Sequence, residues 1–391
     1  MSYNFDTIID RRGTHSLKYD FAVERGKPSD ILPLWVADMD FQAPAEVLEE
    51  LHKAVSHGIF GYSEMKKEYF DAVHDWFIKH FGWETKESWL VKSPGVVFAV
   101  ATAVKAFSRE GEAVMIQPPV YYPFYEAIHL NNRKLVTNTL VYDDHGYSID
   151  FEDFEQKIIT QKVKLFILCS PHNPVGRVWT REELTRMGEI CLKHKVIVLS
   201  DEIHCDFTFP GYEHTVFAGI SDEFAENSVI CTAPSKTFNL AGLQVANLFI
   251  KNETLRQRFK NEVSASGFSQ LNVLGLVACK AAYQYGEPWL QELRAYLYGN
   301  LQYVREFIKN NLPGITLVEP QGTYLIWLDC TALRLGRKGM EKLIVHQAKL
   351  WLDAGHIFGS CGEGFERINI ACTRATLKQA LDQLKKALGA I

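Results

Sequence analysis

The chain lacks long apolar runs, low-complexity tracts, internal repeats and an excess of charge of one sign. Its 42 Lys and Arg and 47 Asp and Glu leave a net charge of -5, which predicts no electrostatic surface for nucleic acid or an anionic membrane. No segment approaches the roughly 20 apolar residues that span a bilayer, and the first residues, MSYNFDTIIDRRG, do not resemble a signal peptide. We therefore expect a cytoplasmic protein that binds a small molecule.

Paired cysteine motifs are also absent, although the chain has eight cysteines. Without a CxxC pair, neither a zinc site nor a redox motif is predicted, and we expect no metal. Several cysteines lie in apolar runs such as KLFILCS, which is typical of buried structural thiols. The eight are Cys169, Cys191, Cys205, Cys231, Cys279, Cys330, Cys361 and Cys372.

Short apolar runs alternate with helical periodicity between about residues 90 and 250. This alternation predicts an α/β domain with a largely parallel sheet covered by helices on both faces. The predicted strands are 112–117, 164–170, 195–201, 228–234 and 245–250, and the clearest predicted helices are 96–107, 181–194 and 255–263.

The last hundred residues have a different pattern, which predicts a smaller α+β unit. It begins with a long amphipathic helix, 287–312, and continues with a strand at 322–329, a helix near 337–353, a strand at 365–371 and a closing helix. The N-terminal stretch LPLWVADMDFQAP is too apolar for a free tail, so we expect it to pack on the body or on a partner subunit. We divide the chain into an N-terminal segment, 1–47, that packs with the small domain, a large domain, 48–288, and a small C-terminal domain, 289–391.

Polar residues follow three of the predicted strands directly. Ligands of open parallel sheets bind beyond the carboxyl ends of the strands, so these positions are candidate site residues. Alone, each segment is also typical of a turn, a helix cap or a solvated lysine. Their order is more specific: Asn173 begins Asn-Pro-x-Gly, Asp201 follows 28 residues later (201 minus 173), and Lys236 another 35 (236 minus 201).

This constellation resembles the fold-type I enzymes that use pyridoxal 5′-phosphate (PLP). The resemblance is greatest to the MalY/PatB group of carbon–sulfur lyases, usually called cystathionine β-lyases, which are related to the class I and II aminotransferases. It implies the aspartate-aminotransferase-like fold, bound PLP and a homodimer with active sites shared between subunits. The stretches that carry it are VADMDF at 36–41, GIFGYSE at 58–64, SPHNPVGRVW at 170–179, SDEIH at 200–204, APSKTFNLAGLQ at 233–244 and QGTYLIWLD at 321–329.

PLP chemistry requires these residue types. A lysine must carry the cofactor aldehyde and then act as the base at the substrate Cα, which is the role predicted for Lys236. A carboxylate keeps the pyridine nitrogen protonated, and Asp201 is the candidate. By the resemblance Asn173 hydrogen-bonds the phenolic oxygen of the ring, and His204 lies where many aminotransferases have a tyrosine for the same role. The alternative for His204 is an incidental polar residue beside a strand end.

The phosphate needs backbone amides at a helix N-terminus, and a Ser-Pro-Gly turn opens the predicted helix 96–107. Gly95, Val96 and Val97 are the predicted donors, and Ser235 is a candidate hydroxyl donor or, alternatively, an exposed turn residue. By the resemblance Tyr62 reaches the phosphate and substrate of the neighbouring subunit.

Three further residues are predicted from the resemblance. Tyr121 stacks on the cofactor face and is counted with Lys236 and Asp201 as catalytic, although it is also typical of a core aromatic cluster with its neighbouring tyrosines. Arg367 grips the substrate carboxylate by a bidentate pair, or else forms a surface salt bridge on an edge strand. The backbone amide of Ala37 faces the same carboxylate.

Two positions depart from the general aminotransferase pattern. Ala233 replaces a hydroxyl residue three before the lysine, and Gln244 replaces an arginine eight after it. Both are similar to the PatB branch, which implies α,β-elimination of L-cystathionine and related cysteine S-conjugates to pyruvate, ammonia and a thiol. The alternatives are a class I/II aminotransferase and a PLP-binding regulatory protein that acts through a partner.

Overall fold

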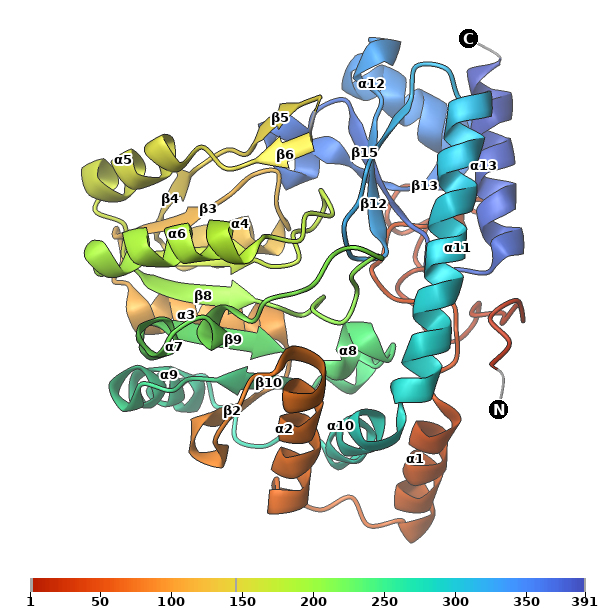
Figure 1. Ribbon diagram of the computed structural model, residues 1–391. Coiled ribbons are helices and arrows are strands. Elements are labelled where there is room, and N and C mark those ends of the chain that lie inside the picture. Colours follow the sequence, from red (N-terminus) through yellow and green to blue (C-terminus); the bar gives the residue numbers. More distant parts are fainter. Residues whose placement is uncertain (1–2, 145, 390–391) are drawn as a thin grey trace.

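The computed structural model describes residues 3–144 and 146–389, which fold around a seven-stranded sheet. Six strands run parallel, and only β10 is antiparallel to both of its neighbours. The order is β2 (Leu90–Ser93), β10 (Ala246–Phe249), β9 (Ser228–Thr232), β8 (Ile197–Asp201), β7 (Leu165–Cys169), β3 (Ala113–Ile116) and β4 (Lys134–Thr137). Figure 1 shows this order from β2 through β10, β9 and β8 to β3 and β4.

Helices cover both faces of this sheet, as the alternating pattern predicts. Side chains alternate along each strand, so β7 sends Leu165 and Ile167 into one core and Phe166 and Leu168 into the other. The first core includes α3 (Val96–Phe107), α4 (Pro123–His129) and α9 (Glu253–Ala265). The second includes α2 (Lys67–Phe81), α5 (Phe151–Gln161), α6 (Arg181–Lys193) and α7 (Asp222–Glu226). The predicted α/β architecture is confirmed, and β2 and β4 are strands that the sequence did not indicate.

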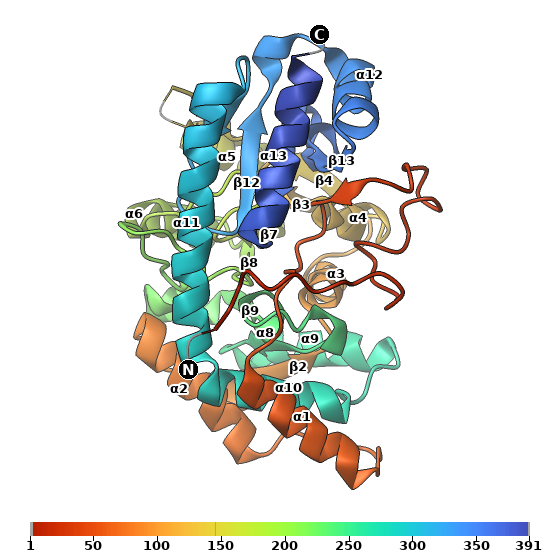
Figure 2. The same cartoon turned by 90° about the vertical axis from the view of Figure 1, so that its right-hand side faces the viewer.

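A second, antiparallel sheet lies in the C-terminal part of the chain. Its order is β11 (Thr316–Val318), β12 (Leu325–Asp329), β15 (Phe365–Asn369) and β14 (Asp353–Ala354). Figure 2 shows α11 (Glu287–Asn311) and α13 (Arg374–Leu388) side by side over β12. The N-terminal segment adds β1 (Leu32–Pro33), which pairs in parallel with β13 (Leu350–Trp351). The remaining elements are α1 (Ala45–His57), α8 (Pro234–Thr237), α10 (Val273–Tyr285) and the hairpin of β5 (Val141–Asp143) and β6 (Gly146–Ser148).

The helix expected near 337–353 is shorter than predicted. Helix α12 (Gly336–Glu341) continues as a π-helix, η5 (Lys342–Gln347), and Lys349 then adopts the left-handed conformation at φ 54°. The following residues form β13 and β14. The apolar residues after the helix pair with β1 and β15, which lie far away in sequence, and local periodicity does not contain that information.

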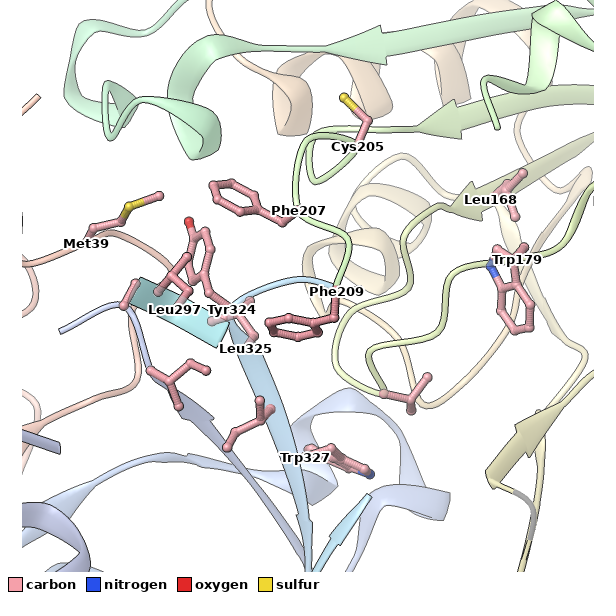
Figure 3. Packing of buried hydrophobic residues seen from close by; sticks show 14 of the residues in the cluster. Met39, Leu168, Trp179, Cys205, Phe207, Phe209, Leu297, Tyr324, Leu325 and Trp327 are labelled. Carbon is pink, nitrogen blue, oxygen red and sulfur yellow. The ribbon is translucent and has the colours of Figure 1, made fainter. Parts of the chain in front are cut away.

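Aromatic side chains join the two sheets. Phe207, in the segment after β8, lies perpendicular to Tyr324, next to the start of β12, with ring centroids 5.0 Å apart (Figure 3). Seven cysteines are buried as predicted, but Cys361 is exposed, because it lies in a short surface turn rather than in an apolar run. Within the described residues no helix combines the length and apolarity needed to cross a membrane.

Candidate active site

A cavity lies beyond the carboxyl ends of β7, β8 and β9, where the sequence places the candidate residues. We call it the strand-end cavity. It encloses about 690 Å³, part of it open to solvent, which is within the usual range for small-molecule sites. It is lined by Ala37, Pro94, Gly95, Val96, Val97, Tyr121, Cys169, Asn173, Asp201, Ile203, His204, Ser235, Lys236, Ala241, Gln244 and Val245.

Lys236 lies on α8, a single helical turn that directly follows β9 and begins with a proline. Its Nζ donates a hydrogen bond to the Ala37 oxygen at 2.8 Å. Burial lowers the pKa of Lys236, whereas Asp38 and Asp201 raise it, and Arg367 lowers it. The net result is a pKa of about 8. The amine is therefore partly neutral near physiological pH, which is the state that attacks an aldehyde.

Asp201 is the last residue of β8 and is 4% exposed. Its Oδ1 accepts a hydrogen bond from the Ile203 amide at 3.2 Å, and no ion pair joins it to any described residue. Burial raises its pKa to about 7, and the positive charge of Lys236 offsets part of this effect. A buried carboxylate without a cation is unfavourable, and a protonated ring nitrogen would supply the missing charge. The site therefore fits PLP at this position.

The N-terminus of α3 forms another wall of the strand-end cavity. It has no side-chain cap, so the first amides of the helix face the cavity with the positive end of the helix dipole. A Cβ added at Gly95 would meet no atom within 4 Å, which leaves space for an anion beside these amides. Ser235 lines the same cavity. This wall has the form of a phosphate-binding site.

Arg367 and Asn173 form a buried pair, of which Asn173 lines the strand-end cavity and Arg367 is not among the lining residues. Arg367 Nη1 donates to Asn173 Oδ1 at 3.0 Å. The side-chain nitrogen of Asn173, Nδ2, is therefore left to donate to a ligand. Arg367 is 2% exposed and lies on β15, between β12 and β14, so the alternative of a surface salt bridge on an edge strand is wrong. It does form an ion pair, but with buried Asp353, and its Nη2 also donates to the Trp35 oxygen at 2.7 Å. Its Nε is buried without a partner among the described residues.

His204 and Tyr121 both line the strand-end cavity. Burial holds the pKa of His204 well below its ordinary value, so the ring is neutral, and its buried Nδ1 has no partner within the described part of the chain. Such an orphaned atom at a cavity wall is available to a ligand. Tyr121 also packs against Tyr122 and Phe124, with ring centroids 5.4 and 5.8 Å apart, so it belongs both to the aromatic cluster and to the cavity.

Of the two predicted residues that remain, Tyr62 lies outside the cavity and Ala37 lies in its wall. Tyr62 is 98% exposed and does not line the cavity of its own chain. Ala37 lines the cavity, and its carbonyl oxygen accepts hydrogen bonds from Lys236 and from the Tyr324 hydroxyl, the latter at 3.0 Å. Only the Ala37 amide was predicted from the sequence. The structure therefore links this segment to the lysine as well as to the cavity.

Several lining residues were not predicted from the sequence. Cys169 was expected only as a structural thiol. It is the last residue of β7 and lies directly beside Asp201 in the sheet. Its Sγ accepts a hydrogen bond from the backbone amide of Asn173 at 3.4 Å. Its position at a strand end was the available signal. Gln244 was noted only as a departure, and it lies in the cavity wall. No cluster of metal-ligating side chains occurs among the residues described.

Comparisons with known proteins agree with this geometry. Residues 29–384 match the family model of the aminotransferases of class I and II. The chain is 44% identical to cystathionine beta-lyase PatB of Bacillus subtilis, over 98% of this chain and 100% of the relative. It is 33% identical to protein MalY of Escherichia coli, over 100% of both chains. The crystal structure of cystalysin from Treponema denticola, which contains a pyridoxal 5′-phosphate cofactor, superposes with a TM-score of 0.96 at 39% identity and full coverage of both chains.

Proposed function

Because this chain belongs to the aminotransferase class I and II family, and within it to the MalY/PatB group of PLP-dependent carbon–sulfur lyases, we propose that it cleaves L-cystathionine and related cysteine S-conjugates by α,β-elimination. One cystathionine and one water give homocysteine, pyruvate and ammonia. The observation that carries the proposal is the convergence of the Lys236 amine, the unpaired Asp201 carboxyl and the uncapped N-terminus of α3 on one cavity.

The described side chains fit PLP part by part. The amides at the start of α3 and the Ser235 hydroxyl would hold the phosphate. Asp201 would pair with the ring nitrogen, and Asn173 and His204 with the phenolic oxygen. Tyr121 would cover one face of the ring. When bound, PLP supplies an electron sink that makes the substrate Cα proton acidic.

The protein supplies positioning and proton transfer. Lys236, in its neutral form, takes the proton from Cα, and the Ala37 oxygen holds its nitrogen in place before reaction. Arg367 fixes the substrate carboxylate while sharing its charge with Asp353. Fixing the carboxylate sets the angle of the Cα–H bond, which selects loss of the proton over loss of the carboxylate. Breaking the Cβ–S bond then releases the thiol.

An aminotransferase would use the same cavity and differs only in the fate of the proton taken from Cα. The lyase is favoured because PatB is named a cystathionine beta-lyase and shares 44% identity over 98% of the chain. Gln244 supports it, because this uncharged residue lines the cavity at the position where the general aminotransferase pattern has an arginine. A purely regulatory role is disfavoured by the intact set of chemical groups.

The test is an assay of PLP-loaded protein with L-cystathionine and no keto acid. Pyruvate and free thiol are expected to appear in equal amounts. Lys236→Ala should abolish both, whereas Lys251→Ala, a lysine of a surface ion pair with Asp222, should leave them unchanged. If neither product forms, but an added keto acid takes up the amino group and L-cystathionine is converted to its own keto acid, the protein is an aminotransferase and the proposed elimination is wrong.

A homodimer that shares its active sites is also part of the proposal. The segment 58–66, between α1 and α2, has no regular structure and exposes large apolar side chains. Ile59 is 71% exposed, Phe60 60% and Tyr62 98%. Exposed apolar groups concentrated in one segment are typical of an interaction surface. We propose that they are covered by a second copy, whose cavity receives Tyr62 at its phosphate end.

Two further expectations remain part of the proposal. The chain divides into an N-terminal segment, 1–47, a large domain, 48–288, and a small domain, 289–391, and the pairing of β1 with β13 supports assigning the N-terminal segment to the small domain. The protein acts in the cytoplasm. Its eight free thiols support this location, because unpaired cysteines are typical of reducing compartments.

A further inference from the structure

A second cavity, apart from the strand-end cavity, is lined by residues of α12, η5, β13, β14 and β15. Figure 1 shows α12, β13 and β15 together in the C-terminal part of the molecule. We call this second cavity the α12 cavity. It encloses about 1160 Å³, part of it open to solvent. Its walls are largely apolar and include Met340, Ile344, Trp351 and Phe365, and Glu366 also lines it.

Glu366 is an unusual residue for such a wall. It is 4% exposed, and its carboxyl has no hydrogen bond or ion pair with any described residue. It is adjacent to Arg367 on β15, but successive side chains of a strand point to opposite faces, so Glu366 faces away from the arginine. Burial raises its pKa to about 8, as does the nearby Asp353, whereas Lys27 acts in the opposite direction. A buried carboxyl without a partner is unfavourable unless a ligand supplies one.

Two ion pairs lie among the residues that line the α12 cavity. Arg337 contacts Glu363 at 2.9 Å, and Lys27 lies 3.6 Å from Glu341. All four residues line the cavity, as does Lys338, which is exposed and forms no ion pair or hydrogen bond with Glu366. Among the described lining residues, Glu366 is therefore the buried acid that is left without a cation.

A second buried acid lines the α12 cavity, and it already has a cationic partner. Asp353 lines the cavity, but its carboxylate is bound to Arg367. His356 lines it too, and burial lowers the pKa of His356, so that this ring carries no positive charge near pH 7. A cationic ligand complements the ionised form of Glu366, and its binding would release the proton that burial keeps on this carboxyl near pH 7.

We propose that the α12 cavity binds a small organic ammonium ion, with its N–H donated to Glu366 and its hydrocarbon body against the apolar wall. A metal ion fits less well, because within the described residues no three ligating side chains meet at one point. Met340, Ile344 and Trp351 supply apolar contact area. The Trp351 ring, held by stacking on Trp35 at 4.4 Å, adds an aromatic surface of the kind that attracts alkylammonium groups.

The experiment is calorimetric titration of the PLP-loaded protein with benzyldimethylammonium. This probe is a tertiary amine, so it cannot condense with the cofactor aldehyde as a primary amine would. One saturable site per chain is expected, with no change in the visible absorbance of bound PLP. Glu366→Gln should weaken binding by at least ~10-fold, because a charged hydrogen bond is replaced by a neutral one. Glu319→Gln, at a surface ion pair with Arg305 outside the cavity, should leave the affinity unchanged.

A matched ligand makes the test independent of any variant. Isobutylbenzene has the same shape, with carbon in place of nitrogen, and it should bind at least ~10-fold more weakly to the unaltered protein. Equal binding of the two ligands, no saturable binding, or equal affinity in Glu366→Gln would each overturn the proposal. Because the readout is binding away from the cofactor, the result does not depend on the proposed lyase activity.

Discussion

Charged neighbours of Lys236 act on its amine in opposite directions. Burial and Arg367 favour the neutral amine, whereas Asp38 and Asp201 favour the ammonium form. The balance lowers the pKa of Lys236 to about 8, so a small change in the surrounding charge alters the fraction of reactive amine at neutral pH.

The rate at which PLP loads onto cofactor-free protein should therefore rise with pH and level off above about 8. The neutral amine is the reactive form, and it becomes dominant above its pKa. Asp38→Asn should move the midpoint to lower pH, because it removes a negative charge that stabilises the ammonium form. The measurement is the growth of visible absorbance after mixing, as a function of pH. Asp30→Asn, at a surface ion pair with Lys349, is the matched control. A midpoint that stays in place or rises in Asp38→Asn would contradict this account.

Asp201→Asn should lower the catalytic rate without destabilising the fold. We expect kcat to fall by ~10²–10³-fold, because the ring nitrogen loses the carboxylate that keeps it charged. Burial raises the pKa of Asp201 to about 7, so the cofactor-free fold loses stability as the pH rises from about 4, the ordinary pKa, to about 7, and the full loss is present at pH 8. The asparagine removes this cost, and the Tm of the cofactor-free variant at pH 8 should equal or exceed that of the parent. A lower Tm together with lower activity would indicate a structural role instead.

At the scale of elements, the segment 36–41 is held from several directions. Asn369 Nδ2 donates to the oxygens of Val36 and Asp38 at 2.7 and 2.6 Å. Asn239 Nδ2 donates to the oxygens of Met39 and Phe41, both at 2.9 Å. These bonds place the Ala37 oxygen against Lys236.

Ion pairs hold the same segment from the side of the N-terminus. Lys18, which is fully buried, contacts Asp40 at 3.0 Å, and Arg11 is bound to both Asp38 and Asp40. The N-terminal segment thus forms part of the support of the active site.

The uncapped start of α3 leads to a prediction of its own. Gly95 has φ 166°, an extended conformation that any residue adopts, and an added Cβ would meet no atom within 4 Å. Gly95→Ala should therefore leave the Tm of the cofactor-free protein unchanged. The methyl group would occupy space needed by the phosphate, so PLP affinity should fall by ~10-fold or more. Titration with PLP followed by absorbance measures the affinity, and unchanged affinity would place the phosphate elsewhere.

At the scale of the whole molecule, the shared active site can be tested by mixing two defective variants. Tyr62→Ala alone should lower activity by at least ~10-fold through loss of a phosphate contact, and Lys236→Ala should abolish it. A hybrid dimer has one site with both residues intact. Refolding the two variants together in equal amounts should therefore restore about a quarter of the parental activity, since half of the dimers are hybrids with one working site of two. Activity no higher than that of the mixture before refolding would show that Tyr62 serves its own subunit or neither.

The amino-acid sequence by itself determined the order of the strands' apolar runs and the polar residues that end them. In parallel strands the carboxyl ends meet at one edge, so this order alone predicts that Asn173, Asp201 and Lys236 are neighbours. The motifs around them also indicated the family and the cofactor, which the comparisons confirm.

Only the tertiary structure decided the surroundings of these groups. Three features depend on contacts between different segments of the chain, which local periodicity does not predict. They are the ion pair of Arg367 with Asp353, the hydrogen bond from Lys236 to Ala37 and the unpartnered carboxyl of Glu366. Ala37 and Lys236 are 199 positions apart, which shows how far such contacts extend along the chain. Burial and charge pairing set the protonation of buried groups, and both are properties of the packed molecule rather than of any local pattern.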